Sequence, residues 1–421
     1  MELKKKMYDA AVIGGGLTGL TAAVYLAKAG KSVLVLEKES ELGGLAKTTN
    51  LNGALFNLGP HAMYEGGAAL RILRELNCLP EGGYASKSGM IGILHGEIVR
   101  VPDDLTQEEN MEWSQLMGGL NQINTESIRS LSLQDWAAKN IRHERVRLFF
   151  YAMCRQWSYC DDMSVLSSGF VIEQGQLAGQ GVRYVDGGWQ AVVDSLRYEA
   201  DKAGITILTG NKADRILRRD GRVHALLLSD GTEIEVSAVI SAAGPVETCR
   251  LIPGSDQFSI GKWNKEARPL YAACYDVALK HLSYPERIFA LGLDEPLYFS
   301  NHSVAVKLSE NGANVLHVMK YNDNDGAQDA KVDETQLTSL LDLLQPGWGK
   351  EVVAARFSPK VLVAHDSRTI YNKGAAPATD PTVPEVPGFF IAGDWVGAEG
   401  RLADTALASA RLAAQKVVNY G

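Results

Sequence analysis

The chain has few cysteines, no long apolar run and no excess of basic residues, and each absence excludes a class of protein. Its 421 residues include five cysteines and no C-x-x-C pair. This argues against a disulfide scaffold or a zinc site and suits a reducing cytosol. No apolar stretch is long enough to span a bilayer, so we expect at most peripheral membrane contact. The formal net charge of −8 argues against a nucleic-acid binder.

Two charged runs have simple interpretations. The basic run 4–6 is expected to be a solvated tail, because no apolar core or cleavage site of a secretory signal follows it. The acidic run 322–326 resembles a calcium loop. However, Tyr321 and Val332 occupy its first and twelfth ligand positions, so we expect a solvated turn and no metal.

A dinucleotide-binding fingerprint opens the chain. The β-prone run 8–13 leads into Gly14, Gly16 and Gly19, which fit G-x-G-x-x-G, and a helical pattern follows. The first glycine permits a tight turn, the second lets the backbone approach a pyrophosphate, and the third lets the helix pack on the sheet. The start of the helix then presents free N–H groups to the phosphates.

A carboxylate stands where a ribose-binding acid is expected. The strand 32–36 ends at Glu37, which is 23 positions after Gly14. Its side chain can accept hydrogen bonds from two ribose hydroxyls, and it would repel a 2′-phosphate. NADP is therefore disfavoured, but NAD and FAD share this fingerprint.

Further segments favour FAD over NAD. A second glycine pair, Gly43-Gly44, follows Glu37, and an apolar strand near the C-terminus ends at Gly393-Asp394 before a helix that starts near Asp404. The positive end of such a helix would stabilise negative charge on a reduced flavin.

Together these motifs resemble the superfamily of FAD-dependent amine oxidases, phytoene desaturases and protoporphyrinogen oxidases, and most closely its bacterial phytoene-desaturase-like branch. The resemblance also covers 56–61, Gly187-Gly188-Trp189 and the strand with Ala213. It implies an α/β fold: a Rossmann-type FAD-binding domain of the glutathione-reductase-2 type, with an interleaved α+β substrate domain. The expected segments are 1–90, 184–260 and 371–421 for FAD binding, and 91–183 and 261–370 for the substrate.

The resemblance implies a cofactor role for twenty residues. On the adenosine side, the pyrophosphate would be held by Gly14, Gly16, Leu17, Thr18 and Gly19, the ribose side by Glu37 and Lys38, and the adenine by the backbone of Ala213. The ribityl side would be lined by Gly43, Gly44 and Leu45, and the pyrophosphate and ribityl chain would also be bound by Gly393 and Asp394. The flavin ring would be approached by Gly59, Pro60 and His61 and, from the C-terminal helix, by Leu402, Ala403, Asp404 and Thr405. No cysteine lies in a motif for covalent attachment, so we expect non-covalent FAD.

Candidates for catalysis and substrate contact are fewer. His61 is the leading candidate for an acid or base near the ring, although a structural histidine after a Gly-Pro turn is the simpler interpretation. Arg155 and Tyr159 could line the substrate cavity or simply pack within a helix face. Tyr298 and His302, on an expected strand, could also face the cavity.

The favoured reaction is dehydrogenation or isomerisation of a largely apolar small molecule. A flavin amine oxidase is the first competing hypothesis, although its lysine near the flavin cannot be chosen among Lys280, Lys307 and Lys320. An NAD-dependent dehydrogenase is the second, and a partner-binding protein in which FAD is structural is the third. A cytoplasmic location is expected; the oligomeric state, substrate and electron acceptor are left open.

Overall fold

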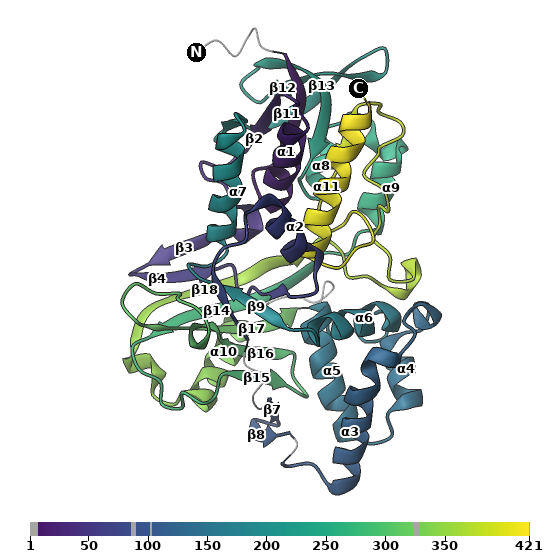
Figure 1. Cartoon of the computed structure of the whole chain (residues 1–421). Coiled ribbons are helices and arrows are strands. Elements are labelled where there is room, and N and C mark those ends of the chain that lie inside the picture. The colour runs from purple at the N-terminus through teal and green to yellow at the C-terminus, as the bar shows by residue number, and fades with distance from the viewer. Residues whose placement is uncertain (1–6, 86–89, 102, 323–328, 421) are drawn as a thin grey trace.

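Two large sheets organise the chain, each with helices packed on it (Figure 1). The structure, a computed structural model, describes residues 7–85, 90–101, 103–322 and 329–420. The basic run 4–6 and most of the acidic run, residues 323–326, lie outside the described residues.

The first sheet is mainly parallel. Five parallel strands run in the order β10 (Thr206–Leu208), β2 (Val33–Leu36), β1 (Tyr8–Ile13), β13 (Glu233–Ser241) and β19 (Phe389–Ile391). Antiparallel β12 (Arg222–Leu228) also pairs with β13 and carries β11 (Ala213–Arg219) beyond it. Strands β1, β2 and β19 are largely apolar and buried, as strands covered on both faces must be.

Helices from distant parts of the chain cover one face of this sheet. They are α1 (Leu17–Lys28), α2 (Ala68–Leu76), α7 (Gln190–Lys202) and the C-terminal α11 (Ala403–Tyr420), which lies next to α1 (Figure 1). Their apolar sides form one buried cluster with the strands. The other face packs against residues around α8 (Pro245–Arg250) and α9 (Ser259–Glu266) and the segment 378–396.

The second sheet is mainly antiparallel. Its order is β18 (Val352–Ala364), β14 (Leu270–Leu279), β17 (Asn314–Asn322), β16 (Leu297–Asn301), β15 (Phe289–Gly292), β7 (Ile91–Leu94) and β8 (Glu97–Arg100), with β15 and β7 parallel. Helix α10 (Ala330–Leu344) packs on one face. Part of α5 (Glu144–Ser158) packs on the other.

A helical unit and two small sheets complete the fold. α3 (Gln107–Gly119), α4 (Leu133–Asn140), α5 and α6 (Ser168–Ala178) share a buried aromatic cluster. A capping box at Thr106 and Glu109 defines the start of α3. The small sheets are β3 (Thr48–Leu51) with β4 (Ala54–Asn57), and β5 (Met63–Tyr64), β9 (Val182–Val185) and β6 (Gly82–Tyr84).

The α/β class expected from the sequence is confirmed, with boundaries of the main elements within a few residues. Within the described ranges, no helix is both long enough and apolar enough to cross a membrane. The division into five segments stays a prediction, although strands β1, β2, β10, β13 and β19 do come from the three segments assigned to FAD binding.

Candidate functional site

A cavity of about 620 Å³ lies where the parallel strands of the first sheet end. Gly14 follows β1, Glu37 follows β2, Ala242 follows β13, and Gly393 lies two residues after β19; all four line the cavity. The carboxyl edge of a parallel sheet is where ligands bind in folds of this type. Sixteen of the twenty predicted cofactor residues line it: Gly14, Gly16, Leu17, Thr18, Glu37, Lys38, Gly43, Gly44, Leu45, Pro60, His61, Ala213, Gly393, Asp394, Leu402 and Ala403.

The two glycine motifs lie against each other at the start of α1. Gly14 has a φ of +107°, which a side chain would strain. Gly16 is the N-cap of α1, and no side chain caps this helix. The Gly43 N–H donates to the Gly15 carbonyl at 3.0 Å, and Gly16 and Gly43 form a parallel bridge. Bare backbone and an uncapped helix start thus face the cavity together, which suits a pyrophosphate.

Gly19 is absent from the cavity lining for a packing reason. A Cβ atom built on Gly19 would lie 1.9 Å from the Gly14 carbonyl oxygen. The residue therefore permits α1 to lie close to the turn after β1, which is the task of the third glycine in the fingerprint. Its contribution to cofactor binding is indirect.

Glu37 is buried and fixed by backbone donors. Its Oε2 accepts from the Gly15 N–H at 2.7 Å, and its Oε1 accepts from the Glu39 N–H at 2.9 Å. Each carboxylate oxygen retains a lone pair for a ribose hydroxyl. Nearby, Lys38 and the segment 211–214, including Ala213, line the same end of the cavity.

Asp394 is held by His365, a residue the sequence analysis did not select. The His365 Nδ1 lies 2.7 Å from Oδ1 of Asp394, and the His365 backbone N–H donates to Oδ2 at 2.8 Å. Burial alone would raise the pKa of Asp394, but the charge and hydrogen bonds of His365 outweigh it and lower that pKa. Burial opposes protonation of His365, but attraction to Asp394 raises the pKa of the imidazole. Both shifts indicate an ion pair.

The start of α11 contributes fewer residues to the large cavity than expected. Leu402, Ala403 and Ala406 line it, and Leu402 has an unusual φ of +49°. Asp404 does not: its Oδ1 accepts from the Ala69 N–H in α2 at 2.8 Å, and burial raises its pKa to about 6. Thr405 is buried and lines neither this cavity nor the smaller one described below. The carboxylate of Asp404 thus accepts a hydrogen bond from a backbone N–H that has no partner within the first turn of α2, and it does not line the larger cavity.

His61 lines the large cavity, but both ring nitrogens already face carbonyls. Nδ1 lies 3.1 Å from the Gly59 oxygen, and Nε2 lies 3.1 Å from the Leu45 oxygen. Burial lowers the pKa of the imidazole below its ordinary value, although both hydrogen bonds oppose this. Gly59 itself does not line the cavity; its φ of +77° makes the turn that precedes His61. These contacts give His61 the environment of a positioning residue rather than of a free base.

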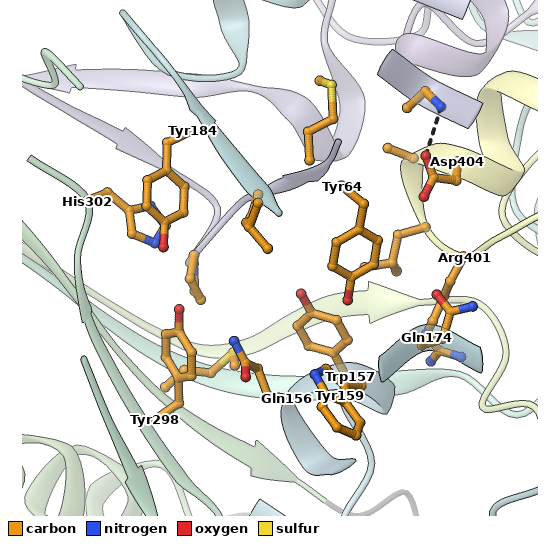
Figure 2. A pocket seen from close by; sticks show the side chains of 18 of the residues that line it. Tyr64, Gln156, Trp157, Tyr159, Gln174, Tyr184, Tyr298, His302, Arg401 and Asp404 are labelled. Atoms are coloured by element: carbon orange, nitrogen blue, oxygen red, sulfur yellow. Dashed lines mark hydrogen bonds between the residues drawn. The ribbon is translucent and has the colours of Figure 1, made fainter. Parts of the chain in front are cut away.

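A second, smaller chamber of about 70 Å³ adjoins the large cavity (Figure 2). The two share six lining residues: Pro60, Ala62, Tyr159, Met319, Leu402 and Ala403. Tyr159, Tyr298 and His302, predicted as substrate contacts, all line this chamber. They are joined there by Tyr64, Trp157, Tyr184 and Tyr321 from other elements, which makes its wall strongly aromatic.

Arg155 does not reach either cavity, in contrast to our expectation. It is buried in α5, where its guanidinium donates to Asp161 Oδ1 at 2.8 Å and to the Gly292 and Leu293 carbonyls at 2.7 and 3.1 Å. The side chain therefore ties α5 to the end of β15. The simpler interpretation, packing within the fold, describes its position.

His302 ends a buried polar chain beside the chamber. It stacks on Tyr184 with ring centroids 3.8 Å apart, and its ring centroid lies 4.6 Å from that of His317. His317 Nδ1 lies 2.7 Å from Oδ1 of Asp276, whose Oδ2 accepts from Arg356 at 2.6 Å. Burial lowers the pKa of His302 well below its ordinary value, so its imidazole is neutral near pH 7.

None of the three candidate lysines lines either cavity. Lys320 Nζ donates to Asp333 Oδ1 and Gln336 Oε1 in α10, each at 2.7 Å, so it points to the opposite face of β17. Lys280 and Lys307 are exposed. Met319 instead lines both cavities from β17.

Several lining residues were missed by the sequence analysis. The ring of Trp189 packs edge-on against that of His61, with the two ring centroids 5.2 Å apart. The segment 242–244 follows β13 and lines the cavity. Segment 361–363 of β18, His365 and Trp395 also line the large cavity, and Arg401 lines the chamber. Gly187-Gly188-Trp189 was noticed as a motif, whereas the two segments and the remaining residues belong to no recognised binding motif.

The donors and shape of the large cavity fit FAD. Bare glycine backbone at Gly14, Gly16 and Gly43 would hold the pyrophosphate, and Glu37 the adenosine ribose. The start of α11 would lie at the flavin end, where the aromatic chamber begins. In the part of the chain that the structure describes, no cluster of three or more His, Cys, Asp or Glu side chains is arranged to hold a metal ion.

Comparison with known proteins identifies the family. The family model for FAD dependent oxidoreductases matches residues 9–415. A carotenoid 3,4-desaturase of Haloarcula japonica is 50% identical over 52 residues, 12% of this chain and 10% of that protein. A 4,4′-diaponeurosporene oxygenase of Staphylococcus aureus is 24% identical over 305 residues, 61% of this chain and 60% of that protein. The chain thus matches from a tenth to three fifths of the length of these curated relatives.

The solved structures agree on the fold. Wild-type putrescine oxidase bound to putrescine superposes with a TM-score of 0.76 at 17% identity, covering 98% of this chain and 99% of that one. Such low identity supports the shared architecture alone. The family match over nearly the whole sequence agrees with the cavity described above, so the chain belongs to the FAD dependent oxidoreductase family and uses FAD as its cofactor.

Proposed function

We propose that this chain catalyses dehydrogenation (desaturation) or isomerisation of a largely apolar organic molecule with bound FAD. One observation carries the proposal: the aromatic chamber meets the FAD cavity at six shared residues, Pro60, Ala62, Tyr159, Met319, Leu402 and Ala403. A substrate in the chamber would therefore lie against the flavin end of the cofactor. The named activities of the desaturase and oxygenase relatives support the same class of chemistry.

When bound, FAD would supply the hydride-accepting redox chemistry at the end of the cavity that meets the chamber. The protein binds, orients and dehydrates the substrate. The buried tyrosines of the chamber wall exclude water and stay protonated, because burial raises the pKa of Tyr159, Tyr298 and Tyr321. When its single proton is on Nδ1, neutral His302 could accept a proton at Nε2, which has no hydrogen-bond partner among the described residues.

The amine oxidase hypothesis has less support. Its fold is shared, but Lys280, Lys307 and Lys320 all lie outside both cavities. The identity of the substrate residues, the five-segment domain division, non-covalent attachment of FAD, a cytoplasmic location and peripheral membrane contact remain our predictions. The small-molecule substrate itself follows from the family.

An anaerobic substrate screen tests the proposal. Purified holoprotein is mixed with unsaturated and saturated apolar compounds and, in parallel, with primary amines, while the flavin absorbance is recorded. Bleaching or isomer formation with an apolar compound supports the proposal. Bleaching by amines alone, with peroxide released on admission of oxygen, would establish the amine oxidase instead. No reaction with any compound would favour a structural role for FAD.

A further inference from the structure

Arg401 is a buried cation without a hydrogen-bond partner among the residues that the structure describes. The residue is 5% exposed and lines the smaller chamber. Within the described residues, its Nε and both terminal nitrogens are buried and have no hydrogen-bond partner. Burial of a guanidinium is unfavourable unless other contacts offset it; the Phe170 ring, with its centroid 5.4 Å from the guanidinium carbon, offsets part of this cost, and a bound anion would offset more. The fold holds Arg401 in a state that an anion of the right shape would stabilise.

The acids of this region are engaged with other groups. Asp366 accepts from the backbone N–H groups of Arg268 and Arg368, each at 3.2 Å. Asp394 is bound by His365, and Asp404, which lines the same chamber, accepts from the Ala69 N–H in α2. Attraction to Asp366 and Asp394 reaches Arg401 only over a longer range, and burial keeps the pKa of its guanidinium below the usual value. The protein therefore leaves the donors of Arg401 free.

Besides Arg401 and His302, two further residues of the chamber have a buried polar atom without a partner among the described residues. Within the described residues, Gln174 Oε1 and Tyr321 Oη are buried without a partner. In Figure 2, Arg401 and Gln174 lie on the same side of the chamber, opposite Tyr184, Tyr298 and His302. The oxygen and nitrogen of an amide can be exchanged by a flip, so Gln174 can present its NH₂ group to the same anion. A guanidinium and an amide on the same side of the chamber can donate to both oxygens of one carboxylate.

We propose that Arg401 and Gln174 bind a carboxylate of the substrate, so that the substrate class is apolar carboxylic acids. Arg401 does not line the larger cavity, which argues against a role in holding the FAD pyrophosphate. A planar guanidinium matches the two oxygens of a carboxylate. The chamber of about 70 Å³ has room for roughly five water-sized groups, which suits a head group with the first carbons of its chain.

The inference rests on the proposed function, because it places the acid beside the flavin, but binding tests it without turnover. Butanoate, hexanoate and octanoate are titrated into holoprotein under anaerobic conditions, together with their methyl esters and the primary amines of equal length. Perturbation of the flavin spectrum gives the Kd, and the shift of Tm is measured separately. We expect the acids to bind roughly 10- to 100-fold more tightly than the esters, as charge-assisted hydrogen bonds would produce.

The variant Arg401→Met separates an anchoring role from a structural one. It keeps an unbranched apolar side chain and removes the charge, together with the contact between the Arg401 guanidinium carbon and the Phe170 ring, whose centroid lies 5.4 Å away. We expect the acids to lose their advantage over the esters, while the ligand-free Tm stays equal to or rises above that of the wild type, because an unpaired buried cation is removed. Arg197→Gln, on the exposed side of α7, controls for the loss of a surface charge. It should change neither the preference for acids over esters nor the ligand-free Tm.

Equal Kd values for acids and esters, tighter binding of amines, or retained acid preference in Arg401→Met would each overturn the inference. A large fall in the ligand-free Tm of Arg401→Met would also do so by showing that the cation stabilises the fold. Carboxylate binding without flavin reduction by any acid would leave the inference standing and count against the proposed function.

Discussion

His365 and Asp394 form a partly buried ion pair at the wall of the FAD cavity, with Nδ1 and Oδ1 2.7 Å apart. His365 follows β18 in the second sheet, and Asp394 follows β19 in the first. The pair therefore connects the two sheets at the residue that we expect to bind the ribityl side of FAD. It links cofactor binding to the arrangement of the sheets.

Replacing His365 is expected to weaken FAD binding. His365→Asn keeps a donor near the Nδ1 position but removes the charge, so Asp394 would be less firmly oriented. We expect the affinity for FAD, measured by titrating apoprotein and following the quenching of flavin fluorescence, to fall roughly 10-fold. Unchanged affinity would show that Asp394 does not depend on its partner.

The same pair predicts a pH dependence of stability. The pKa of His365 is raised in the folded state, so its contribution is complete below the unfolded pKa of 6.5 and is lost as the pH rises through the folded value. The pKa of Asp394 is lowered, so its contribution is present above 3.8 and lost only in stronger acid. The difference in unfolding free energy between wild type and His365→Asn should therefore be larger at pH 6 than at pH 9. A constant difference would contradict the ion pair.

Two glycines of the first motif should respond in opposite ways to alanine. A Cβ on Gly16 meets its nearest atom, the Gly43 oxygen, at 3.5 Å, whereas a Cβ on Gly19 would lie 1.9 Å from the Gly14 oxygen. We expect apo Gly16→Ala to keep its Tm and lose at least about 10-fold in FAD affinity, because its methyl group faces the phosphate site. Gly19→Ala should unfold at a lower temperature or fail to fold. If both variants lost only stability, the assignment of Gly16 to the phosphates would be wrong.

Glu37 should contribute to affinity for FAD through its charge. In Glu37→Gln an NH₂ group must face either the Gly15 or the Glu39 N–H, so one hydrogen bond is lost and two donors oppose each other. We expect a loss of roughly 10- to 100-fold in the affinity of apoprotein for FAD. Glu41→Gln, on an exposed residue paired with Lys47, is the matched control and should bind FAD normally. Equal affinities of the two variants for FAD would show that Glu37 does not contribute to FAD binding.

His302 should affect turnover more than substrate binding. If its Nε2 accepts a proton, His302→Gln should lower kcat at least about 100-fold while changing KM little. Stacking on Tyr184 predicts that His302→Phe retains the fold but not the rate. A change in KM alone would indicate that His302 shapes the chamber without taking a proton.

The sequence was most informative where a motif and its surroundings acted together. Gly14, Gly16, Glu37 and Gly43 could be placed because strand, turn and helix patterns fix where the backbone comes close to a cofactor. Asp404 could not, since its preference for the Ala69 N–H depends on how α2 and α11 pack. The role of Arg155 could not be predicted either, because a buried arginine can donate to backbone carbonyls as well as to a ligand.

The chamber was the least predictable part of the site. It is assembled from α5, α6, β5, β9, β16, β17 and the start of α11, which are far apart in sequence. Its aromatic residues follow no shared spacing, and a single arginine such as Arg401 carries no pattern at all. Only the three-dimensional arrangement shows that the donors of Arg401 have no hydrogen-bond partner within the described part of the chain.

The absorption spectrum of the purified protein, before and after heat denaturation, is the decisive measurement for bound FAD. We predict the visible absorption bands of a flavin, and release of the yellow cofactor into the supernatant, where it should be identified as unmodified FAD. A colourless protein whose spectrum does not change when FAD is added would show that the cavity does not hold this cofactor.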